Sequence, residues 1–213
     1  GKGDLTGAER FLKRAVELDS GNSQYHRNLG FVYAGRNRLK RAGRALAEAV
    51  RLDPADVEAH YRLAWVQRAR GDMPGFIEHL QVIISIDADH ALANNDLGCY
   101  MAQQGDLDQA QVYLRQGVAA EPENPSFLTN LANTQMIAGD IVEARQTFGE
   151  AVRKGPDFVE AMKGLATAER LLGNIGDALI ASEKALALTP DDATALNLSG
   201  TVYKELGRYD DAL

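Results

Sequence analysis

Residues 23–56 carry the pattern that decides the fold, and they read SQYHRNLGFVYAGRNRLKRAGRALAEAVRLDPAD. Apolar residues recur three and four places apart in both halves of this stretch: Leu29, Val32 and Tyr33, then Leu39, Leu46, Ala49 and Val50. This spacing is typical of amphipathic helices. The stretch therefore predicts two helices, one in each half.

The same pattern returns along the chain at a fixed interval of 34 residues, the distance from Ala8 to Ala42. One column of mostly small residues holds Ala8, Ala42, Phe76, Ala110, Ala144, Ala178 and Ala212, and a second holds Gly30, Ala64, Gly98, Ala132, Ala166 and Gly200. A fixed period of this length indicates an array whose neighbouring units bury a continuous core. We expect an all-α solenoid, in which small side chains let two helices approach closely.

Two further columns predict the turns between the helices. Residues that tolerate a left-handed backbone stand where the first helix should end: Gly3, Asn37, Gly71, Gly105, Gly139, Gly173 and Gly207. Residues that can cap the second helix follow: Asp4, Asp72, Asp106, Asp140 and Asn174. Asp106 with Gln109, and Asp140 with Glu143, have the spacing of a capping box. Proline then ends several units, as Pro54 does.

Together, Leu29-Gly30-x-x-Tyr33, Ala42-x-x-x-Leu46 and Pro54 resemble the tetratricopeptide repeat. The resemblance covers the whole chain. It implies a right-handed superhelical array of antiparallel helix pairs, expected as one domain over residues 1–213. Complete repeats would span 23–56, 57–90, 91–124, 125–158 and 159–192, with partial repeats at 1–22 and 193–213.

Composition narrows the class of protein. The chain is 45% hydrophobic, with no long uncharged apolar stretch, so we expect no membrane insertion. A single cysteine excludes an internal disulfide and any zinc site built on several thiolates. The compartment stays open, with the cytoplasm as the expectation. Arginine outnumbers lysine and alanine is abundant, which favours a bacterial source.

Charge is distributed unevenly along the chain. Residues 1–70 carry 14 Lys or Arg against 8 Asp or Glu, whereas residues 71–213 carry 9 against 22. The densest basic run holds Arg36, Arg38, Lys40, Arg41, Arg44 and Arg51. A solvated outer face is the ordinary explanation of such a run, and a docking patch for an acidic partner is the alternative. The acidic remainder argues against nucleic-acid binding.

No catalytic motif stands out, so we expect a non-enzymatic protein without cofactors or metal. The chain has no HExxH, GxSxG, phosphate loop or CxxC. His26 and His60 occupy equivalent positions in successive units and are interpreted as packing residues. His90 is interpreted as a loop residue, and Cys99 lacks a histidine at helical spacing.

Function is therefore expected from the surface of the array. The resemblance implies that first helices line a concave groove, into which the second, fifth, ninth, twelfth and thirteenth residues of each unit point. We place the partner-binding groove at Arg27, Phe31, Tyr61, Arg62, Trp65, Arg68, Asn95, Cys99, Asn130 and Asn133. Aromatic and arginine residues of this kind are enriched at binding hot spots. The alternative is that Trp65 only packs against Tyr61.

The groove predicts a protein or peptide ligand with acidic and apolar side chains. Asn95, Asn130 and Asn133 form an amide patch that could bond a peptide backbone. A carboxylate clamp like that of chaperone-binding members is missing, because Phe31, Arg62, Leu92 and Asp96 stand at its positions.

The repeat at 57–90 departs most from the pattern. Phe76 replaces a small residue, Gln67 an aromatic one and Ala88 a proline, and Pro74 lies near the second helix start. Because overpacking a close crossing typically costs about 1–3 kcal/mol, we expect wider helix separation or a changed superhelical angle there.

Two other roles compete with a binding scaffold. The chain begins and ends in mid-repeat, so it is expected to be a piece of a longer protein, such as the substrate-recognition arm of a glycosyltransferase. Alternatively, residues 1–22 of one molecule could pack end to end on residues 193–213 of another, which would give a homo-oligomeric scaffold.

Overall fold

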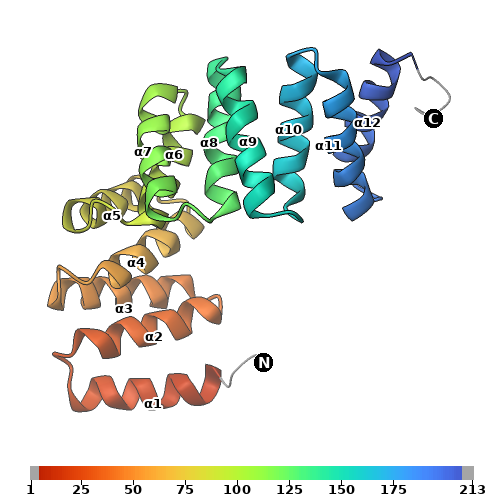
Figure 1. The fold of residues 1–213 in the computed structure, drawn as a ribbon. Coiled ribbons are helices and arrows are strands. Elements are labelled where there is room, and N and C mark those ends of the chain that lie inside the picture. The colour runs from red at the N-terminus through yellow and green to blue at the C-terminus, as the bar shows by residue number, and fades with distance from the viewer. Residues whose placement is uncertain (1–4, 208–213) are drawn as a thin grey trace. The chain divides into compact units, whose positions relative to one another are not determined.

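The computed structural model describes residues 5–207, and this part of the chain consists of helices joined by short turns, with no strand (Figure 1). The helices are α1 (Leu5–Leu18), α2 (Ser23–Gly35), α3 (Leu39–Leu52), α4 (Val57–Ala69), α5 (Met73–Ile86), α6 (Ala91–Gln103), α7 (Leu107–Ala120), α8 (Pro125–Ala138), α9 (Ile141–Lys154), α10 (Val159–Leu171), α11 (Ile175–Leu188) and α12 (Ala193–Glu205). The expected all-α solenoid of helix pairs is confirmed. Gly3, Asp4 and Ala212 lie outside the described residues.

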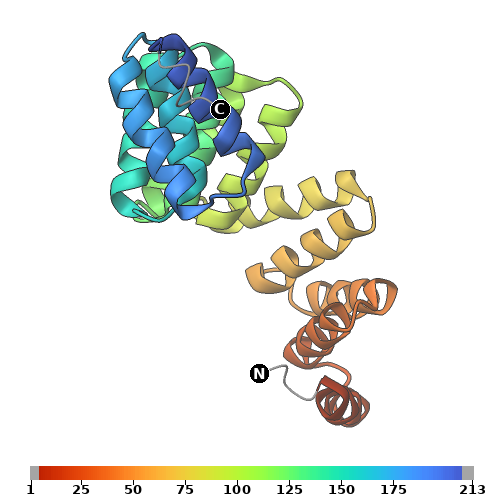
Figure 2. The ribbon, with the colours of Figure 1, turned by 90° about the vertical axis from the view of Figure 1, so that its right-hand side faces the viewer.

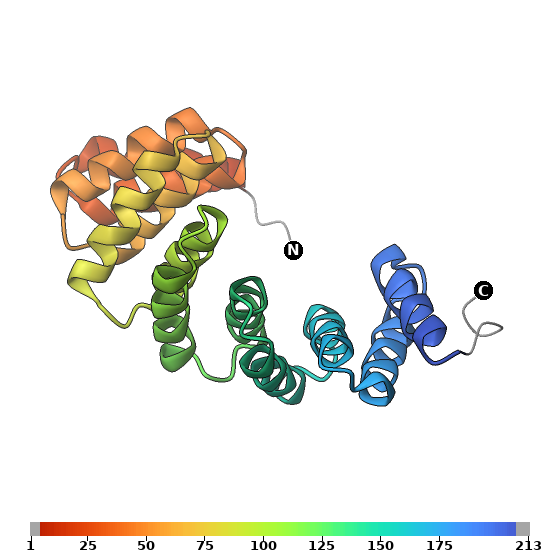
Figure 3. The same ribbon diagram turned by 90° about the horizontal axis from the view of Figure 1, so that it is seen from above.

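The chain divides into two compact units, Gly1–Ala93 and Asn94–Leu213, with the boundary in the first turn of α6. In the first unit, α2 packs on α3 and α4 packs on α5 (Figure 2). In the second unit, α8 packs on α9 and α10 on α11, and these helices lie side by side in chain order (Figure 3). That the two units form one continuous array stays a prediction.

The predicted turn column has the backbone that it requires. Its five described glycines have positive φ angles, from 73° at Gly207 to 91° at Gly139, and Asn37 has φ 55°. Glycine adopts this conformation without a Cβ clash, and asparagine tolerates it better than most residues. The first helix of each pair therefore ends where the sequence predicts.

The small-residue columns mark close helix crossings. Ala42, Ala110, Ala144 and Ala178 are fully buried. A Cβ added to Gly98 would lie 3.0 Å from the backbone oxygen of Ala110, so only glycine fits between α6 and α7 as they stand.

Capping of the second helices is only partly as predicted. Asp72 and Asp106 accept hydrogen bonds from the backbone amides of Gly75 and Gln109, at 3.1 and 3.2 Å. Asp140 and Asn174 make no such bond. Asp140 instead accepts from the Gln111 side chain, and the Asn174 amide donates to Glu169, because the neighbouring helices offer these competing partners.

A second capping column went unnoticed in the sequence. The residue before the first helix caps it through its side chain at Asn22, Asp56, His90, Asn124 and Asp192. Phe158, before α10, is the exception among the described first helices. His90 is thus more than a loop residue, since its Nδ1 accepts from the Ala93 amide at 3.1 Å. These residues share the spacing of the repeat, which was the available signal.

Candidate protein-binding groove

A pocket of about 400 Å³ lies between the first helices of the first unit. Its walls include Phe31 of α2, Trp65 of α4 and Leu92 at the start of α6, whose exposed fractions are 51%, 42% and 40%. The buried residues Leu46 and Val66 complete its apolar lining. Ligand pockets characteristically have this combination of concave shape and apolar wall.

The aromatic residues of the pocket are held by one another. The Tyr61 ring meets the Trp65 ring edge to face, with centroids 6.4 Å apart, and also contacts the His90 ring at 5.7 Å. On the α5 side, Phe76 meets Trp65 edge to face at 6.2 Å. Edge-to-face pairs of this kind are favourable, so the indole is positioned before any ligand arrives.

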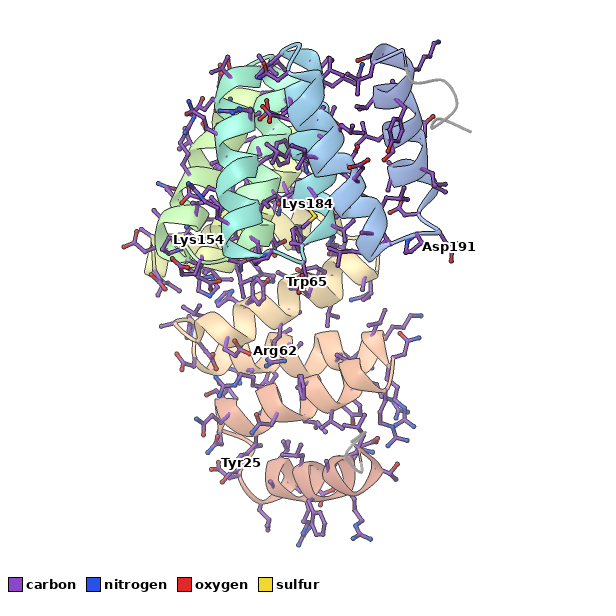
Figure 4. All side chains as sticks on the ribbon, turned by 45° about the vertical axis from the view of Figure 1, so that its right-hand side comes forward. Tyr25, Arg62, Trp65, Lys154, Lys184 and Asp191 are labelled. Atoms are coloured by element: carbon purple, nitrogen blue, oxygen red, sulfur yellow. The ribbon has the colours of Figure 1, made fainter. Side chains whose placement is uncertain are left out.

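Two arginines from α4 lie on these rings. The Arg62 guanidinium carbon is 4.3 Å from the Phe31 ring centroid, and Arg62 also forms an ion pair with Glu58. The Arg68 guanidinium carbon is 4.8 Å from the Trp65 centroid and 5.3 Å from that of Phe76. Both contacts are within cation–π range. Arg62 and Trp65, labelled in Figure 4, belong to the same helix as Arg68.

Arg27 forms an ion pair outside the pocket. Its Nη1 donates to both carboxylate oxygens of Asp56 at 2.9 Å, and Asp56 also caps α4 through the Ala59 amide. Lys163 and Asp192 repeat this arrangement four repeats later, with Lys163 Nζ 2.9 Å from Asp192 Oδ2. A basic residue at this position therefore holds the start of the next first helix, and Arg27 does not line the pocket.

The predicted amide patch lies in the second unit. There the Asn130 side chain donates to the Asn95 carbonyl oxygen at 2.9 Å, and Asn95 is buried. Asn133 is exposed one turn further along α8, and Cys99 is half-buried on α6. The structure brings Asn95 and Asn130 together, but their bond uses part of the capacity that a peptide would need.

Leu92 and Glu58 are among the pocket residues that the sequence did not assign to the groove. Leu92 is the second residue of its repeat, a position that the family resemblance marks as inward-facing, so the sequence contained a signal for its place in the pocket. Glu58 is the second residue of the preceding repeat and also lines the pocket. Its pairing with Arg62 follows helical i,i+4 spacing.

A histidine pair joins α4 to α5. The Nδ1 atoms of His60 and His79 are 3.0 Å apart, and His60 Nε2 lies 3.1 Å from the Pro54 carbonyl oxygen. Since that oxygen only accepts, His60 Nε2 donates to it, and His60 Nδ1 accepts from His79 when both rings are neutral. Burial, together with the neighbouring His60, lowers the pKa of His79, although Glu78 and Asp72 act in the opposite direction.

Much of the basic run is already paired. Arg36 and Arg38 each donate to the buried carboxylate of Glu9 at 2.7 Å. A hydrogen bond from Lys13, with Arg38 and Arg36 nearby, lowers the pKa of Glu9. Ion pairs of this kind tie α1 to the turn between α2 and α3. A docking patch built on the whole run is thereby disfavoured.

The described part of the chain carries neither a metal-binding cluster nor a membrane-spanning helix. Among residues 5–207, no three His, Cys, Asp or Glu side chains gather in an arrangement that could hold a metal ion. In the same range, no helix combines the length and hydropathy that a membrane span needs.

Solved structures similar to this chain share its fold. YrrB, described as a TPR protein with an unusual peptide-binding site, is 18% identical, with a TM-score of 0.74 over 87% of this chain and 96% of its own. PilF of Pseudomonas aeruginosa is 19% identical, with a TM-score of 0.77 over 91% and 88%. PilW, described as a widely conserved type IV pilus biogenesis factor, is 22% identical, with a TM-score of 0.75 over 89% and 88%.

Family models give the more direct assignment. Two models described as tetratricopeptide repeat match residues 27–91 and 101–169, which together make up more than half of the chain. The comparison with curated proteins gave no match. The helix pairs, their fixed period and these matches agree, and the chain belongs to the tetratricopeptide repeat family.

Proposed function

We propose that this protein is an interaction module whose first unit binds a polypeptide segment carrying apolar and acidic side chains. Proteins of this family characteristically bind protein or peptide partners. The observation that carries the proposal is the pocket framed by Phe31, Trp65 and Leu92, which come from three successive first helices. Exposed apolar side chains gathered around a concavity often mark an interaction site.

The walls of this pocket resemble the centre of an interface. Tryptophan, tyrosine and arginine dominate interface hot spots, and Trp65, Tyr61 and Arg62 all line the same cavity. The rings contact one another before a ligand is present, so little side-chain entropy remains to be lost on binding. YrrB, similar in fold, is described as having a peptide-binding site, which is consistent with such a role.

A displayed library of random peptides tests the proposal. Peptides enriched on the wild-type protein are expected to lose about 2 kcal/mol of binding free energy, roughly thirtyfold in affinity, on Phe31→Ala or Trp65→Ala. Val112→Ala on α7 and Ile180→Ala on α11 are matched controls, because both side chains are exposed on second helices. Equal binding by all four variants, or no enrichment at all, contradicts the proposal.

A further inference from the structure

Three arginines lie on the first helices of the unit Gly1–Ala93. They differ in whether they already form an ion pair with a carboxylate of this chain. Arg27 is held by Asp56, and Arg62 pairs with Glu58. Within residues 5–207, no carboxylate lies within ion-pair distance of Arg68, and its guanidinium lies over the rings of Trp65 and Phe76. Arg68 is therefore the one of the three whose hydrogen-bonding edge has no acidic partner among the described residues.

We propose that Arg68 is the specificity-determining residue of the groove: it accepts a carboxylate of the bound segment while a bulky apolar side chain of that segment fills the pocket beside Trp65. This inference rests on the proposed function and adds the residue that binds the ligand carboxylate and the spacing between the two ligand groups. A guanidinium placed on aromatic faces keeps its in-plane N–H groups available for a carboxylate. Two ring contacts also restrict the side chain, so less conformational entropy is lost when the ion pair forms.

The ion pair with Glu58 explains why Arg62 is not the residue that binds the ligand carboxylate. Both residues line the pocket, and their ion pair already neutralises the Arg62 charge beside Phe31. A ligand carboxylate at Arg62 would have to displace Glu58 and would meet its negative charge. Arg68 imposes no such exchange. Residues 1–70 also carry a surplus of Lys and Arg, which favours the approach of an acidic segment.

Geometry sets the spacing between the two ligand groups. Arg68 does not line the pocket itself; it lies 4.8 Å from the Trp65 ring, which does. An apolar side chain packed at roughly 4–5 Å from the indole and a carboxylate on Arg68 are then separated by up to about 10 Å. An extended chain covers that span in about three residues, at roughly 3.3 Å each. The acidic residue is therefore expected two or three positions from the apolar one.

A displayed library of random seven-residue peptides, sequenced after selection on each variant, tests this assignment. On the wild-type protein we expect Asp or Glu to be enriched two or three positions from a large apolar residue. On Arg68→Gln the acidic preference should vanish while the apolar preference remains. Arg62→Gln is the matched control from the same helix and should keep both preferences. Arg68→Lys, which retains charge without the planar fork, should keep part of the acidic preference.

Fluorescence of the single tryptophan then measures the effect for one selected peptide and its Asp→Asn version. The wild-type protein should bind the acidic version about two- to fivefold more tightly, the range expected of an exposed ion pair. Added salt should reduce this difference. Arg68→Gln should bind both versions equally.

The outcomes separate this inference from the function on which it rests. An acidic preference unchanged in Arg68→Gln overturns the role of Arg68 and leaves the proposed function standing. Peptides with an apolar preference but no acidic one overturn the role of Arg68 and narrow the proposed function to apolar segments. Loss of the acidic preference in Arg62→Gln instead would assign the carboxylate to Arg62. Failure to enrich any peptide relative to Trp65→Ala overturns the proposed function itself.

Discussion

At the scale of single residues, neighbours decide what one residue type does. Arg27 and Arg68 are both arginines on first helices, but Asp56 binds the first and aromatic rings hold the second. The family resemblance implied that both are inward-facing. It could not show which was already paired, because Asp56 lies 29 residues from Arg27 and meets it only through packing of α2 on the start of α4.

His79 allows a residue-scale prediction about pH. Its pKa is lowered in the folded protein, so the unfolded chain binds a proton more readily. The folded state is therefore fully stabilised above the ordinary histidine pKa of about 6.5 and loses that contribution as pH falls below it. His79→Asn should show a shallower loss of stability between about pH 7.5 and 5, measured by urea unfolding at each pH.

His26→Asn is the matched control for that experiment. His26 stands one repeat before His60 and bonds the Ser20 carbonyl oxygen, but no second histidine contacts it. Comparing the two variants therefore separates the effect of the histidine pair from that of replacing any one histidine. If His79→Asn retains the full wild-type slope, the histidine pair does not contribute to acid sensitivity.

At the scale of elements, α5 shows how one irregular helix is accommodated. Phe76 replaces alanine and is only 1% exposed, and the adjacent Gly75 leaves room for the Gln67 side chain. A Cβ at Gly75 would lie 2.7 Å from the Gln67 amide carbon. The residue before the large Phe76 thus carries no side chain, and Gln67 of α4 fills the space beside it. The expected change of helix separation in this repeat stays a prediction.

Phe76→Ala tests whether this helix pair depends on the ring. Alanine is the regular residue of the column, but the Phe76 ring contacts Trp65 and Arg68, so its removal leaves a cavity behind the groove. We expect a loss of about 3–5 kcal/mol in unfolding free energy, measured by urea denaturation. A loss below about 1 kcal/mol would mean that α4 and α5 close together as in the other repeats.

At the scale of the whole molecule, stability in a repeat array comes from each unit and its immediate neighbours. Leu46 of α3 is fully buried in the first unit, and Phe148 of α9 is almost fully buried in the second. Removal of either side chain should lower the local stability of the helices around it more than that of distant helices.

Leu46→Ala should lower amide hydrogen-exchange protection mainly in α2, α3 and α4, whereas Phe148→Ala should lower it mainly in α8, α9 and α10. Hydrogen exchange followed by mass spectrometry distinguishes these regions, because each helix gives its own peptides. Each variant serves as the control for the other. A uniform loss of protection along the chain in both variants would indicate a single cooperative unit instead.

The sequence alone determined the helices, their turns and the family, because those features depend on local preferences that recur in every unit. Gly139 has a left-handed backbone and Ala144 is buried, as their columns require. Only the tertiary structure decided which groove residues are available for a ligand. The pairing of Arg27 with Asp56, the entry of Leu92 into the pocket and the placement of Arg68 on two rings all depend on how successive helices pack. Such contacts depend on which side chains meet across successive helices, and those side chains differ from repeat to repeat, so the shared columns alone do not single them out.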